Sequence, residues 1–87
     1  QFSAELRAGA DLLSRLEDGA VIVVRSSLFF APHVTPEMIT DKHLLFIVGA
    51  VAVCPKPLLG TVQANSIVGN MVMDEEAYEA FRKKYKV

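Results

Sequence analysis

Apolar residues gather in three extended runs, each closed by helix-breaking residues. The runs read "VVRSSLFFAPHVTPEMI" from Val23, "FIVGAVAVCPKPLLGTV" from Phe46 and "SIVGNMVMDEEAYEAF" from Ser66. Each has extended apolar residues, then a small residue, an alternating apolar pair and a breaker. The small residues are Ser26, Gly49 and Gly69, and the pairs are Leu28 and Phe30, Val51 and Val53, and Met71 and Met73. Because Val, Ile and Phe favour strands, the pattern predicts three strand-and-turn units.

The spacing of these units predicts how they assemble. The small residues lie 23 and then 20 residues apart, which is within the range of periods associated with solenoid architectures. We therefore expect an α/β chain with a small repeat (solenoid-like) sheet of about three strand-turn units, made of short parallel strands over residues 20–73. The alternative is an α+β domain with a three-stranded antiparallel sheet. Both arrangements bury the same set: Ile22, Val24, Leu45, Ile47, Val51, Val53 and Ile67.

Helices are predicted at both ends of the chain and after the first strand. Leu6, Gly9, Ala10, Leu13 and Leu16 recur at helical spacing, which predicts a helix over residues 4–17 with Ser3 as N-cap. The first strand is expected over residues 20–30. A short helix should then begin at Pro36 after Thr35, and Pro57 should open a helical turn in the second unit.

The last segment, "DEEAYEAFRKKYKV", has the strongest helix pattern. Asp74 suits the N-cap, acidic residues fill the first turn and basic residues the last, so the charges complement the helix dipole. We expect one domain over 1–87, with an N-terminal capping helix in 1–19 and a C-terminal capping helix in 74–87.

Composition narrows the function classes. The 87 residues are 52% hydrophobic, which leaves apolar surface on so small a domain, and their formal charge of −1 argues against nucleic acid as a partner. The apolar run from Leu44 stops at Cys54, well short of the roughly 20 residues of a spanning helix, so no membrane insertion is expected. A single cysteine and the lack of a signal-peptide pattern indicate a cytoplasmic protein.

Candidate chemistry is sparse. His33, His43 and Cys54 lack metal-ligand spacing, and no base or orienting group accompanies Cys54 in a known motif. The carboxylate pairs at Glu17-Asp18 and in 74–76 are explained by helix ends, and the glycines stand singly. We predict no catalytic, cofactor-binding or metal residues, and hence no enzyme activity.

One resemblance concerns residues 21–73. "FIVGAVAVCPKPLLGTVQANSIVGNMVM", together with "VTPEMITDK", resembles the strand-turn repeats of uncharacterised bacterial proteins with a V-x-G-x-h-x-h-x-P pattern, in which h is apolar. That resemblance implies no known activity or cofactor. The period is also similar to that of leucine-rich repeats, but the asparagine of that motif is missing from the second and third units.

The functional expectation follows from the excess of apolar residues. We predict a non-enzymatic structural or protein-interaction module that self-associates, as a homo-oligomer or within a larger parent protein. The alternative is a small enzyme or redox-sensitive protein that uses Cys54.

Overall fold

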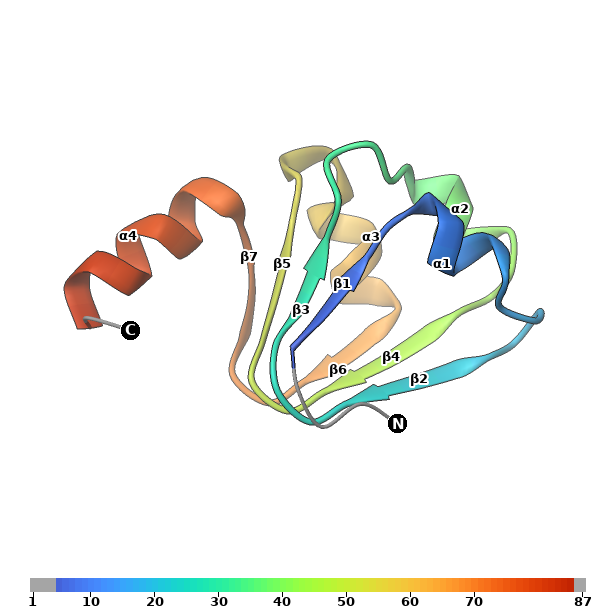
Figure 1. Cartoon of the computed structure of the whole chain (residues 1–87), viewed down its shortest axis with the longest axis horizontal. Helices are drawn as coiled ribbons and strands as arrows, with labels where there is room; N and C mark the ends of the chain where they lie inside the picture. Colours follow the sequence, from blue (N-terminus) through green and yellow to red (C-terminus); the bar gives the residue numbers. More distant parts are fainter. Residues whose placement is uncertain (1–4, 86–87) are drawn as a thin grey trace.

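A computed structural model describes residues 5–85, which form seven strands and four α-helices in a two-sheet α/β fold (Figure 1). The four-stranded sheet contains β1 (Leu6–Ala8), β3 (Leu28–Phe30), β5 (Val51–Cys54) and β7 (Met71–Asp74), in that order. The three-stranded sheet contains β2 (Val21–Val24), β4 (Leu45–Val48) and β6 (Ser66–Val68). The helices are α1 (Ala10–Ser14), α2 (Pro36–Thr40), α3 (Leu59–Ala64) and α4 (Glu75–Tyr85), and a 3-10 turn, η1 (Lys56–Leu58), precedes α3.

Each predicted strand is in fact two strands that belong to different sheets. The chain leaves β2, β4 or β6, bends sharply, and enters β3, β5 or β7 of the other sheet. The bends lie side by side and are hydrogen bonded, since Gly49 N–H donates to Val24 O and Gly69 N–H donates to Val48 O, both at 2.8 Å. In Figure 1 the two sheets therefore diverge from the line of bends like the arms of a V.

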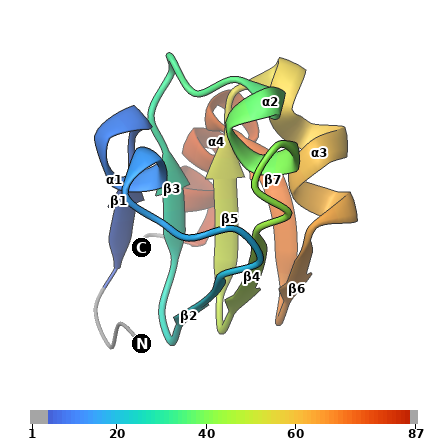
Figure 2. The same cartoon turned by 90° about the vertical axis from the view of Figure 1, so that its right-hand side faces the viewer.

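The main core fills the space between the sheets and the helices. α1 contacts α2, and α2 contacts α3, so these short helices form a layer across the open side of the V (Figures 1 and 2). Inward side chains from both sheets meet there, and Phe30 and Phe46 pack edge to face with ring centroids 5.3 Å apart. The largest fully buried side chains are Phe46, Leu13, Leu28, Ile39, Leu44 and Leu58.

α4 packs outside this core. Tyr78 and Phe81 rest on Val51, Val53 and Met73, which point outward from the four-stranded sheet. Asp74 caps the helix as expected, because its Oδ1 accepts a hydrogen bond from Ala77 N–H at 2.7 Å. α4 thus covers part of a sheet face.

The predicted architecture is wrong. The solenoid-like sheet of about three strand-turn units is contradicted by two separate parallel sheets of four and three strands. The antiparallel alternative is also wrong, because every strand pair is parallel. Nor do helices cap both ends, since α1 lies in the helix layer and α4 on a sheet face.

The N-terminal helix is wrong for most of its predicted length. Leu6–Ala8 is a strand paired with Leu28–Phe30, and only Ala10–Ser14 is α-helical. The predicted N-cap Ser3 lies outside the described residues. In contrast, Thr35 is the N-cap of α2 and Pro36 its first residue, as the sequence predicts.

Candidate functional site

The outward side of the three-stranded sheet is covered by aliphatic side chains, which we call the apolar face. Alternation along β2, β4 and β6 turns one set of residues into the core and the other outward. The outward set is Val21, Val23, Leu45, Ile47 and Ile67. Val21, Ile47 and Ile67 keep 55%, 36% and 62% of their surface exposed, so they are open to a partner.

Strand register aligns these side chains into rows. Val23 pairs with Ile47, and Ile47 with Ile67, which gives one row across all three strands. Val21 pairs with Leu45 and begins a second row. Because neighbouring strands lie about 4.8 Å apart, side chains in a row touch and form a continuous surface.

A bare apolar side is unusual for a parallel sheet. Parallel strands are normally covered on both faces, whereas α1, α2 and α3 all lie on the inner side of this sheet (Figure 1). Within the part of the chain that the structure describes, no outward position of β2, β4 or β6 carries a charge. Contiguous exposed apolar residues of this kind mark interaction surfaces.

The prediction that Leu45, Ile47 and Ile67 are buried is therefore wrong. Their neighbours Phe46 and Val48 point into the core instead. Because both sides of Leu45–Val48 are apolar, hydropathy alternation contains no signal for which side faces inward. Ile22, Val24, Val51 and Val53 are buried as predicted.

Cys54 lies at the end of β5 and points into the main core, with none of its surface exposed. Burial, assisted by the negative charge of Asp74, raises the pKa of its thiol to about 11. A thiol of this kind is protonated at neutral pH, and the thiolate is the nucleophilic form. This environment disfavours a reactive cysteine.

Each of the two histidines has a polar contact with another part of the chain. His33 Nε2 accepts a hydrogen bond from Ala10 N–H at 3.3 Å, next to the start of α1. His43 has a positive φ of 52°. Its Nδ1 atom lies 2.9 Å from Oδ1 of Asp18, within hydrogen-bond distance. Over residues 5–85, no group of three or more His, Cys, Asp or Glu side chains is placed to hold a metal ion.

Between residues 5 and 85, no helix is both long enough and apolar enough to cross a membrane.

No protein-family model matches the sequence, and no curated protein or solved structure matches it either. The resemblance to bacterial strand-turn repeats stays a prediction.

Proposed function

We propose that the protein is a non-enzymatic interaction module that self-associates through its apolar face. The observation that carries this proposal is the exposure of Val21, Ile47 and Ile67 in adjacent strands of one sheet. Removing such side chains from water is favourable by about 25 cal/mol for each Å² of apolar surface.

A second copy is the occupant that this surface favours. A face made only of aliphatic side chains has no charge that needs an opposite partner, so it complements itself across a two-fold axis. Two such sheets can pack face to face about 10 Å apart with their side chains interleaved. The net charge of −1 opposes the approach of two copies only weakly.

The test is the molar mass in solution, measured by light scattering over a range of protein concentrations. We expect the mass to rise from 9.5 kDa towards that of a dimer. Ile67→Glu should remain monomeric over the same range, because its carboxylate would be buried without a partner in the interface. A wild-type chain that stays monomeric at every concentration contradicts the proposal.

Met71→Glu is the matched control. Met71 is 54% exposed, close to the 62% of Ile67, but it lies on the four-stranded sheet. The same charge there should leave association unchanged. Equal loss of association in both variants would mean that net charge, and not the apolar face, controls the mass.

A further inference from the structure

The free sides of β6 and β7, which we call the open edge, lack the cover that the fold gives to the preceding strands. β4 and β5 pair with β2 and β3, and β6 and β7 pair in turn with β4 and β5. Over residues 5–85, no strand pairs with the far side of β6 or β7. Figure 2 shows β6 at the border of the molecule with no strand beyond it. The open edge is therefore where a further strand can be added.

Core side chains are partly exposed at the open edge. Val68 is in register with Val48 and is only partly buried, whereas Val48 is 2% exposed. Val72 is also partly buried, although it is in register with the fully buried Ala52. An edge position alone does not expose a core valine, because Val24 on the edge strand β2 is only 1% exposed. The core is thus incompletely covered at β6 and β7.

Backbone groups at the open edge are placed to bind an extended chain. The carbonyl oxygen of Asn65 and the N–H of Gly69 both form hydrogen bonds with β4. Because backbone groups alternate between the two sides of a strand, those of Ser66 and Val68 point to the open edge. β6 has no charged residue and no proline, which are the features that protect many edge strands from pairing.

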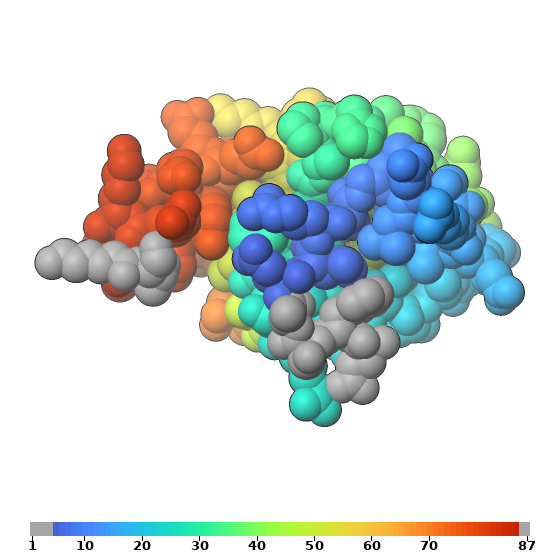
Figure 3. All heavy atoms as spheres, viewed as in Figure 1, coloured from blue at the N-terminus to red at the C-terminus, as the bar shows by residue number. Residues whose placement is uncertain are grey.

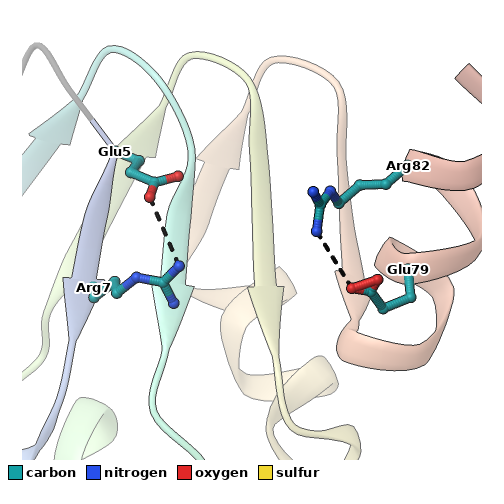
Figure 4. Close-up of polar contacts among 4 residues, drawn as sticks. All are labelled: Glu5, Arg7, Glu79 and Arg82. Atoms are coloured by element: carbon teal, nitrogen blue, oxygen red, sulfur yellow. Dashed lines mark hydrogen bonds and ion pairs between the residues drawn. The ribbon is translucent and has the colours of Figure 1, made fainter. Parts of the chain in front are cut away.

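The opposite edge of the four-stranded sheet does have such protection. Its edge strand β1 carries Arg7, which lies 3.7 Å from Glu5 in an exposed ion pair (Figure 4). Charged side chains on an edge strand oppose pairing with another chain. α4, orange and red in Figure 3, packs on the outer face of this sheet, so it covers a face and adds no strand to the open edge.

The fold itself shows what covers an edge of this kind. The edge of β2 and β3 is covered by two short strands joined at Gly49, and the edge of β4 and β5 by two short strands joined at Gly69. Each glycine is needed, because a Cβ atom there would overlap the carbonyl oxygen of the preceding bend. The matching occupant of the open edge is a third segment with the same pattern.

A second folded copy cannot supply this segment in the parallel orientation. Its β3 and β5 each have two neighbours already, and its β7 is free only on the side that forms its own open edge. We propose that the open edge binds a strand–glycine–strand segment of a partner protein, which pairs parallel to β6 and β7 and covers Val68 and Val72. This mode of binding combines main-chain hydrogen bonds with burial of alternate apolar side chains.

The test is a titration with a capped synthetic peptide, followed by NMR shifts and hydrogen exchange of the backbone amides. The probe is Lys-Ser-Ile-Val-Gly-Asn-Met-Val-Met-Lys, which repeats residues 66–73 between two lysines that limit its aggregation. We expect shifts in β6, β7 and their bend, with slower exchange of the Ser66 and Val68 amides. Absence of these changes at millimolar peptide would overturn the proposal.

Two changes within the peptide test the close approach of the bends. The probe with Gly69→Ala should bind about tenfold more weakly, because its new Cβ atom would overlap the carbonyl oxygen of Gly69 in the protein. The probe with Asn70→Ala is the matched control and should bind as the unchanged probe does. Equal affinities of the two altered peptides would contradict the proposed stacking.

Two further measurements distinguish the open edge from other parts of the protein. Val21→Glu changes the apolar face two strands away from β6 and should leave binding of the probe unchanged. Loss of binding in this variant would place the peptide on the apolar face and would refute the proposal. Faster exchange of the Ile67 amide, which points to β4, would also refute it, because the peptide would then have displaced β6.

Discussion

The backbone of Gly69 lies so close to the carbonyl oxygen of Gly49 that a Cβ atom at position 69 would overlap it. Gly49 is placed in the same way against the carbonyl oxygen of Arg25. The neighbouring bends therefore touch through their backbones, and the glycines are needed for space.

We predict that Gly69→Ala lowers the free energy of unfolding by about 1–3 kcal/mol, the usual cost of overpacking a closed contact. Gly60→Ala is the control, because a Cβ there has no neighbour within 4 Å and position 60 lies in α3. That change should stabilise the protein by about 0.5–1 kcal/mol. Urea unfolding of both variants measures the difference, and effects of the same sign would contradict the close stacking of the bends.

Lys42 should contribute to stability as a cap on α1. Its Nζ donates hydrogen bonds to the carbonyl oxygens of Leu13, Ser14 and Leu16 at 3.2, 2.7 and 2.8 Å. These carbonyl groups lie at the C-terminal end of the helix, where a cation is favourable. We expect Lys42→Met to lower the free energy of unfolding by about 1–3 kcal/mol.

Lys83→Met is the control for this change. Lys83 is an exposed residue in the last turns of α4, so its loss should alter the unfolding free energy by less than about 0.5 kcal/mol. Thermal or urea unfolding of the two variants gives the comparison. An equally small effect at Lys42 would show that its hydrogen bonds add nothing to stability.

The contact between His43 and Asp18 should make stability depend on pH. The hydrogen bond from His43 to Asp18, followed by the negative charge of Asp18, raises the pKa of His43 above its ordinary value of 6.5. The folded state therefore favours protonated histidine. Its stabilising effect is fully present below the unfolded pKa and is lost as pH rises through the folded pKa.

A proton NMR titration of the His43 ring checks this directly. Asp18→Asn should lower the pKa of His43, because it removes the charge and the carboxylate acceptor, while Glu17→Gln should leave it nearly unchanged. A titration curve of His43 that does not move in Asp18→Asn would contradict the assigned pair.

Cys54 should react slowly in the folded protein. With the thiol fully buried and its pKa raised to about 11, modification by a disulfide reagent at pH 8 requires local opening of the chain. We expect the rate to be far below that of the same thiol in denaturant. A native rate equal to the denatured rate would contradict the buried position and would restore the case for a reactive cysteine.

Parts of the fold follow directly from local sequence rules. Pro36 and Asp74 predict helix starts correctly, because the fixed φ of proline and the capping carboxylate of aspartate both act within the first turn of a helix. The alignment of Gly49 with Gly69 also holds, since their bends are stacked. In the first unit, however, Val24 pairs with Val48, so Arg25 and not Ser26 lies opposite Gly49.

The remaining prediction errors concern segments in which hydropathy does not distinguish one face from the other. Val51–Cys54 is buried at every position because the core lies on one side and α4 on the other, so its pattern could not assign faces. Leu6–Ala8 is too short for its helical spacing to be distinguished from a strand, and only pairing with β3 determines its conformation. The apolar face was missed because both sides of Leu45–Val48 are apolar, so hydropathy does not show which side of this strand faces the core.

The most direct test of self-association uses the isoleucine methyl groups as reporters. Ile47 and Ile67 point outward from the apolar face, while Ile22 and Ile39 are buried and provide internal controls. NMR relaxation caused by a soluble paramagnetic agent measures the exposure of each methyl group at low and high protein concentration. We predict that Ile47 and Ile67 become protected as concentration rises, while Ile22 and Ile39 are protected throughout. Full exposure of Ile47 and Ile67 at every concentration would contradict the account.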